Sequence, residues 1–180
     1  MANKAPGHDR REKIRNQFWG GEDAWTGDDE KGWFRAPRTL PLILLLLKDK
    51  RLTGSLDPAS VYLELWSRHM SAGVIEMAHE GEHSYASGYS GTRSVRTWQE
   101  RMKILEELGF IKSQMVGNQR HRYVLLVHPT VVIQRLFDEK KIAPLWWDTY
   151  RARQSDTREA SYNERKNSNV VQIGDAKKRA

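Results

Sequence analysis

Residues 93–103 carry side chains that can recognise the edges of DNA bases. Arginine can donate two hydrogen bonds to guanine, glutamine can pair with adenine, glutamate can accept from cytosine, and a valine methyl can contact thymine. We expect this stretch to read base sequence; an ordinary solvated helix face is the alternative. The predicted DNA-binding residues here are Arg93, Ser94, Val95, Arg96, Thr97, Gln99, Glu100 and Lys103.

A helix over 94–108 is predicted to position these residues. Its apolar residues recur at i, i+4, i+7 and i+10 and form one stripe: Trp98, Met102, Leu105 and Leu108. Ser94 is a candidate N-cap, because its hydroxyl can accept a bond from an unpaired amide of the first turn. Gly109 follows at a position where a helix end favours a positive φ.

Two β-rich runs, 110–116 and 122–127, follow the helix and are joined by a short polar link that contains Gly117 and Asn118. The pattern predicts a hairpin. Its arginines are expected to contact phosphate or reach into a minor groove, and a solvated hairpin tip is the alternative. The predicted DNA-binding residues of the hairpin are Asn118, Gln119, Arg120 and Arg122.

Three features in this order resemble the winged helix-turn-helix superfamily: Ser-x-Arg-Thr at 94–97, Leu-Glu-Glu-Leu-Gly-Phe-Ile at 105–111, and the hairpin. The resemblance covers residues 84–127. It implies that the helix over 94–108 enters the major groove of DNA. It also implies that the hairpin tip, 117–122, is a wing that lies along the DNA backbone or minor groove. The turn over 88–93 is longer than is usual in that family.

Charge and composition favour an anionic partner. The chain carries a formal charge of +7 and no cysteine, and nucleic acid is the commonest partner of a basic protein. Seven cations and three acids lie between residues 93 and 125, and such a concentration of charge promotes counterion release from DNA. The longest apolar run, 40–47, is too short to span a bilayer. We therefore expect a cytoplasmic protein without membrane contact.

Residues 79–83, His-Glu-Gly-Glu-His, match the zinc-peptidase pattern His-Glu-x-x-His. The glycine weakens the helix that this pattern requires, so we expect a solvent-exposed loop here. A distant third ligand among His69, Glu64 and Glu76 stays open, which keeps a zinc metallopeptidase as a disfavoured alternative. Residues 88–91 are one residue short of a nucleophile elbow and are expected to form a turn. We predict no enzyme activity, cofactor or metal.

The whole chain is predicted to be mainly α with a small β-hairpin wing, a winged helix-turn-helix core with extra N- and C-terminal helices. Residues 1–32 are expected to be a largely disordered arm, 33–154 the winged-helix domain with flanking helices, and 155–180 a disordered basic tail. Further helices are predicted from Thr39, from Asp57-Pro58, over 130–141 and from Pro144. A short strand over 74–77 is expected to pair with the wing.

These patterns predict a sequence-specific protein that binds double-stranded DNA. Its simplest role is a transcriptional repressor that acts as a homodimer, because two-fold symmetry adds affinity and sets half-site spacing. A replication or partition protein of a plasmid or phage is the alternative with the same chemistry. A winged domain used only for protein interaction is a further alternative.

Overall fold

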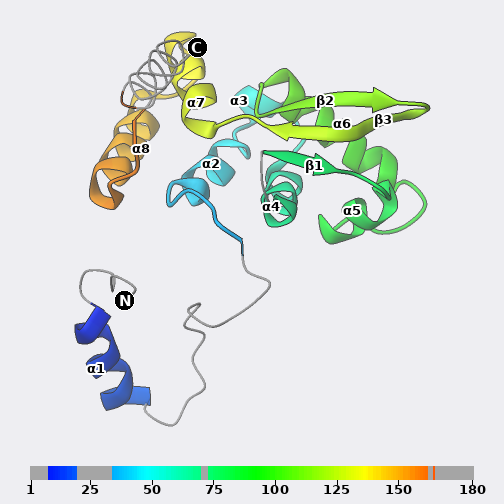
Figure 1. Ribbon diagram of the computed structural model, residues 1–180. Helices are drawn as coiled ribbons and strands as arrows, with labels where there is room; N and C mark the ends of the chain where they lie inside the picture. The colour runs from blue at the N-terminus through cyan, green and yellow to red at the C-terminus, as the bar shows by residue number, and fades with distance from the viewer. Residues whose placement is uncertain (1–7, 20–33, 70–72, 162–163, 165–180) are drawn as a thin grey trace, which may run out of the picture. The chain divides into compact units, whose positions relative to one another are not determined.

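The computed structural model describes residues 8–19, 34–69, 73–161 and 164. The chain forms two units, Met1–Trp33 and Phe34–Ala180. In the first unit, helix α1 covers His8–Trp19 (Figure 1), a helix that the sequence pattern did not predict. The remainder of the predicted arm, and the predicted tail beyond residue 164, lie outside the described residues.

The second unit is mainly helical with a small antiparallel sheet, which confirms the predicted fold class at that level. Its elements are α2 (Leu40–Leu46), α3 (Lys50–Thr53), α4 (Ala59–Arg68), β1 (Val74–Glu76), α5 (Glu80–Ala86), α6 (Ser94–Glu107), β2 (Ile111–Val116), β3 (Gln119–Leu126), α7 (Pro129–Asp138) and α8 (Pro144–Thr157). No described helix has the length and apolar character needed to cross a membrane.

The sheet has the strand order β1-β3-β2, and every neighbouring pair is antiparallel. The predicted pairing of the short strand with the hairpin is confirmed, because Ile75 of β1 lies opposite Val124 of β3. The predicted six-residue hairpin tip is wrong. Gly117, at φ +59°, allows a tight turn with Asn118, and residues 119–122 lie in β3 instead.

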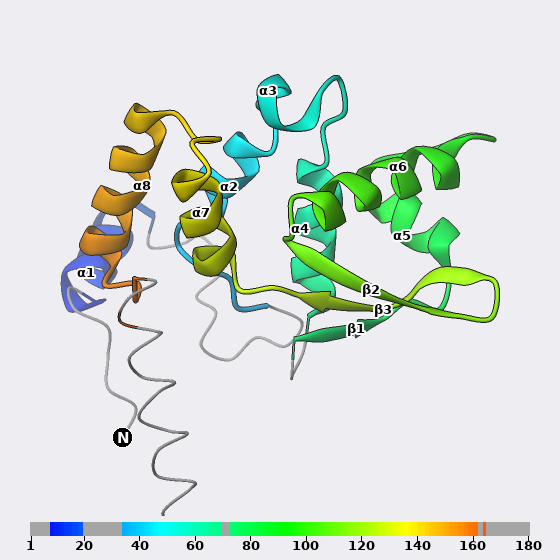
Figure 2. The same cartoon turned by 90° about the horizontal axis from the view of Figure 1, so that it is seen from above.

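The helices α4, α5 and α6 lie over one face of the sheet, and α7 and α8 lie at the end opposite the β2–β3 turn (Figure 2). The predicted stripe of α6 faces inward, where Trp98, Met102 and Leu105 are fully buried. Between helix and sheet, the rings of Tyr62 and Phe110 meet edge to face, 5.2 Å between centroids. The core therefore fixes which face of α6 reaches solvent.

Helix α2, the first helix of the second unit, is buried on one side only. Ile43 and Leu47 have no exposed surface, but Leu45 is 59% exposed, so one side of this apolar helix reaches solvent. Thr39 occupies the N-cap position without a capping bond. Its hydroxyl instead donates to a carboxylate oxygen of Glu159, at 2.8 Å, and its amide donates to the other oxygen, at 3.2 Å.

The C-terminal helices α7 and α8 complete the core. Ile133, Leu136 and Tyr150 are buried, and Phe137 stacks on Trp147 with 4.0 Å between ring centroids. Helix α8 continues to Thr157 and so extends past the boundary at 155 that was predicted for the tail.

The sequence predicted the C-terminal end of α6 correctly but not its N-terminal end. The prediction that Ser94 is the N-cap is wrong, because the cap is Arg93 and no side chain bonds the first-turn amides. The prediction for Gly109 is confirmed, since it follows the helix at φ +76°. A Cβ at that position would lie 2.8 Å from the Arg135 guanidinium, which donates to the Leu108 carbonyl.

Candidate nucleic-acid interface

Burial of the apolar stripe leaves the predicted base-reading residues of α6 on the outer face. Arg93, Arg96, Gln99, Glu100 and Lys103 are exposed, whereas Ser94, Val95 and Thr97 are half-buried. The Arg96 side chain is 82% exposed and that of Lys103 is 61% exposed. The longest cationic side chains of this face are therefore accessible to a partner.

Ion pairs run along this face at helical spacing. Arg96 Nε lies 3.4 Å from Glu100 Oε1, and Lys103 Nζ lies 3.5 Å from Glu107 Oε1. Exposed pairs of this kind contribute little to stability, about 0–1 kcal/mol, because water screens them. The cations can therefore exchange these carboxylates for a nucleic-acid ligand at small cost.

Gln99 is held differently, by a residue of another helix. Its Nε2 donates to Glu80 Oε2 at 2.8 Å, across the packed pair α5 and α6. The other carboxylate oxygen of Glu80, Oε1, is buried and makes no hydrogen bond within the described part of the chain. Glu80 and Gln99 are 19 positions apart and no local sequence pattern links them, so this role of Glu80 was not predicted.

The hairpin side chains are tied to neighbouring elements. Arg120 pairs with Glu106 at 3.3 Å, and Arg122 pairs with Glu76 and donates to the Met77 carbonyl. The side chain of Arg122 is 27% exposed, so the structure places it against β1 and away from the turn. Asn118 in the turn is exposed.

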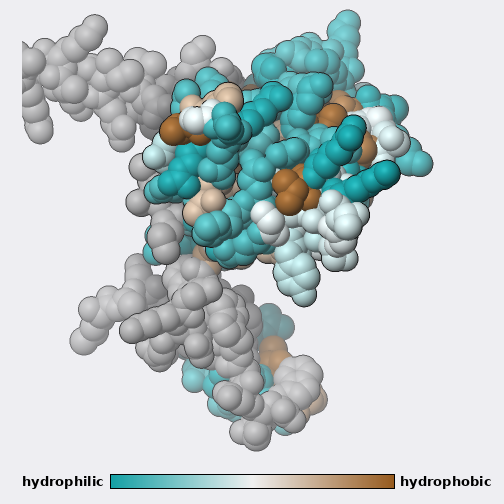
Figure 3. Space-filling view, turned by 90° about the vertical axis from the view of Figure 1, so that its right-hand side faces the viewer, coloured by the Kyte–Doolittle hydropathy of each residue, from teal (hydrophilic) through white to brown (hydrophobic). Residues whose placement is uncertain are grey.

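A hollow of about 580 Å³ lies between the start of α5 and the hairpin turn. Its lining comes from 78–81 on one side and from Val116, Asn118 and Gln119 on the other. Glu80 lines this hollow and also bonds Gln99. The structure thereby brings the predicted helix and hairpin contacts to the same region. The face on the side of the hairpin turn is largely hydrophilic with a few hydrophobic spots (Figure 3).

The long turn between α5 and α6 is anchored through Tyr89. Its hydroxyl lies 3.3 Å from the Asp57 carbonyl and 3.3 Å from Ser60 Oγ. The Arg101 guanidinium sits over its ring, 5.1 Å from the centroid. The predicted turn over 88–91 is confirmed, with Gly88 at φ +90°. These contacts connect the turn before α6, and Arg101 in the middle of α6, to the start of α4.

Residues 80–83 lie in α5 and His79 is its N-cap, so the prediction of an exposed loop over 79–83 is wrong. His83 is buried, and its Nδ1 lies 3.0 Å from Glu64 Oε1. Arg68 also binds Glu64, at 2.9 Å, and pairs with Glu82. Packing of His83 against α4 and α6 offsets the weak helix preference of the glycine. No group of side chains that could hold a metal ion occurs among the described residues.

A second buried histidine, His121, belongs to β3 of the hairpin. His121 Nδ1 is 2.8 Å from Ser113 Oγ, and the ring meets Trp98 edge to face, 5.7 Å between centroids. Burial lowers the pKa of His121 below its ordinary value; nearby Glu106 opposes this shift and Arg120 reinforces it. The lowered pKa favours the neutral form of this ring, which extends from β3 and packs on Trp98 of α6.

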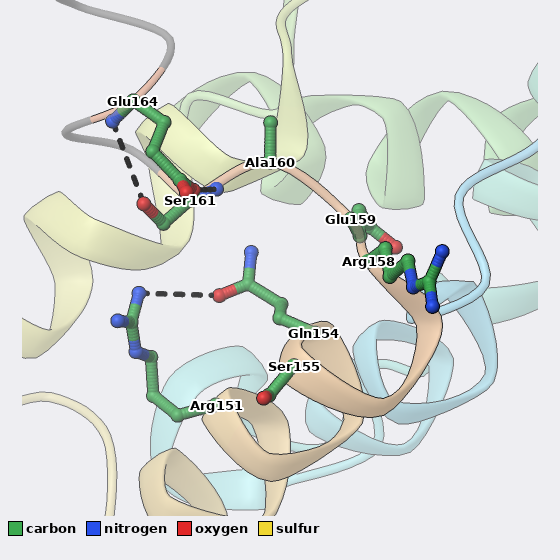
Figure 4. Close-up of a pocket in the computed structure, with 8 residues that line it drawn as sticks. All are labelled: Arg151, Gln154, Ser155, Arg158, Glu159, Ala160, Ser161 and Glu164. Carbon is green, nitrogen blue, oxygen red and sulfur yellow. Dashed lines mark hydrogen bonds between the residues drawn. The ribbon is translucent and has the colours of Figure 1, made fainter.

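A separate hollow of about 550 Å³ lies at the C-terminal end of α8 (Figure 4). Arg151 donates to Gln154 Oε1 there, at 3.3 Å. The lining includes two arginines and two glutamates, Arg151, Arg158, Glu159 and Glu164. Because these formal charges offset one another, the hollow lacks the positive field that an anionic ligand would need.

The folded surroundings reduce the positive charge of the candidate interface. Glu76 and Glu80 each bond a side chain of residues 93–125, so these two acids offset part of the positive charge counted there. No family model, curated protein or solved structure matches this chain. The resemblance to winged helix-turn-helix proteins therefore stays a prediction.

Proposed function

We propose that this chain binds double-stranded DNA in a sequence-specific manner through a winged helix-turn-helix unit formed by α4, β1, α5, α6, β2 and β3. In this proposal α6 lies in the major groove and the β2–β3 hairpin contacts the DNA backbone. One observation carries it: α6 buries its apolar stripe and presents Arg96, Gln99 and Lys103 outward. These side chains differ in hydrogen-bonding chemistry, as direct readout of bases requires.

The biological role that we propose is transcriptional repression by a homodimer. Apolar side chains at a distance from α6 support self-association, since Leu145 is 80% exposed and Leu45 is 59% exposed. A dimer would place two copies of α6 on one duplex, which raises affinity and requires two half-sites. Sedimentation at micromolar concentration tests the dimer, and a monomer at all concentrations would exclude it.

Fluorescence anisotropy with a labelled duplex tests DNA binding. Replacement of both Arg96 and Gln99 by alanine should weaken binding, because both side chains leave the proposed readout face. The matched control replaces Lys48 alone by alanine, which removes the same single positive charge; Lys48 is exposed and makes no ion pair within the described residues. Equal loss in both variants would show that charge alone drives binding, and unchanged binding in both would remove α6 from the interface.

A further inference from the structure

We infer that Glu80 is a positioning residue that orients the Gln99 amide, and that Gln99 thereby reads an adenine in preference to a guanine. This inference rests on the proposed function. It names a base preference for one residue of the readout face and assigns a role to a carboxylate that does not itself contact the base.

The orientation of the amide follows from the chemistry of its partner. An ionised carboxylate has acceptors only, so the Gln99 group that faces it must be the Nε2 amine. The distance of 2.8 Å from Nε2 to Glu80 Oε2 agrees with such a bond. One N–H of Gln99 is thereby occupied, which leaves the carbonyl Oε1 and the second N–H for another ligand.

Glu80 is suited to hold this position. It is the first residue of α5, a helix that packs against α6, and it is half-buried. Its Oε1 is inaccessible to solvent. The Arg96–Glu100 pair offers a contrast, because both of its side chains lie on one helix surface and are exposed. The acceptor of Gln99 is therefore more buried than either member of the Arg96–Glu100 pair.

The tethered amide fits one purine edge better than the other. Adenine presents the N7 acceptor and the N6 amine donor in the major groove, which match one N–H and one carbonyl oxygen. Guanine presents two acceptors, N7 and O6. A free glutamine can turn both N–H groups toward these acceptors, but a glutamine with one N–H held by Glu80 cannot. Removal of Glu80 should therefore admit guanine at the position that Gln99 reads.

Selection of bound sequences from a random duplex pool tests the inference with the full chain and four variants. Gln99→Ala identifies the base position that depends on this side chain. Glu80→Ala should reduce the adenine-to-guanine ratio at that position by about tenfold and leave the other positions unchanged. Glu80→Gln retains an acceptor oxygen and should preserve most of the ratio. The control Glu82→Ala removes a carboxylate of α5 that pairs with Arg68, and should change nothing at that position.

A thermal melt of each variant shows whether it is folded, and a shift in base ratio at one position is a readout that general destabilisation would not produce. An unchanged ratio in Glu80→Ala, with a clear wild-type site, would overturn the inference alone. A wild-type selection that enriches no sequence would overturn the proposed function, and the inference with it.

Discussion

Arg96 and Arg120 lie in different surroundings, and the proposed complex gives them different roles. Arg96 extends from the outer face of α6, whereas Arg120 leaves β3 and pairs with Glu106. Arg96→Ala should cost about 1–3 kcal/mol of binding free energy at one base position and relax specificity there. Arg120→Ala should weaken binding to all sequences and reduce the salt dependence by about one phosphate contact. Titrations of cognate and scrambled duplexes at several salt concentrations measure both effects. Identical behaviour of the two variants on both duplexes would contradict the assignment.

The buried His121 makes stability depend on pH. Its pKa in the folded chain lies below the ordinary value because of burial, so the unfolded chain takes up a proton first as the pH falls through about 6.5. The free energy of unfolding should therefore fall as the pH falls below that range. Glu106, Arg120 and Glu80 are the charged groups that act on the ring: the two glutamates raise its pKa and Arg120 lowers it.

Urea unfolding of the wild type and of His121→Gln between pH 5 and 8 measures this dependence. The variant should show a flatter profile over the same range, because the titrating group is absent. Parallel profiles for the two proteins would assign the pH dependence to other residues.

At the residue scale, sequence reasoning identified the buried stripe but not the tethers. Trp98 and Met102 follow from helical periodicity, which is a local property. The hydrogen bonds that Gln99 donates to Glu80 and that Arg122 donates to Glu76 join residues 19 and 46 positions apart. They depend on how α5 packs against α6 and on the register of the sheet, so no local sequence pattern predicts them.

At the scale of elements, two glycines differ in how well their positions would accept a side chain. Gly109 has φ +76°, and a Cβ there would lie 2.8 Å from Arg135 Nη2. Gly109→Ala should therefore lower the free energy of unfolding by more than the usual 0.5–1 kcal/mol scale of glycine-to-alanine effects, about 1–3 kcal/mol.

Gly81 is the matched control for this substitution. It lies in α5 and has open space around its Cβ position. Gly81→Ala should stabilise the fold by about 0.4–1 kcal/mol, because alanine is the better helix former. Denaturant titration measures both variants, and a stabilising Gly109→Ala would contradict the described end of α6.

The predictions failed both at the start of α6 and at residues 79–83, where no helix was expected. The first turn of α6 uses no serine cap, since Arg93 takes the cap position after the turn that Tyr89 anchors. Residues 80–83 of the histidine motif form the start of α5, because His83 is buried against Glu64. In both places a tertiary contact overrode the local preference, which a sequence pattern alone does not contain.

At the scale of the whole second unit, the chain closes through Glu159 and Thr39. The Glu159 carboxylate accepts hydrogen bonds from both the hydroxyl and the amide of Thr39, a residue 120 positions earlier in the chain. Glu159→Ala should remove both bonds and lower the free energy of unfolding by about 1–3 kcal/mol, because hydrogen bonds to a charged group exceed neutral ones. Denaturant titration measures the loss, and Asp156→Ala, an exposed acid of α8, is the control. Equal stability of the Glu159 variant and the wild type would show that this closure contributes nothing.

The claim that α6 and the hairpin form a sequence-specific DNA interface is tested most directly by selection from a random duplex pool, followed by salt titration of the winner and a scrambled control. We expect one enriched site, palindromic for a dimer, that is bound about 10³-fold or more tightly than the control at physiological salt. Binding without any enriched sequence, or no binding at all, would contradict it.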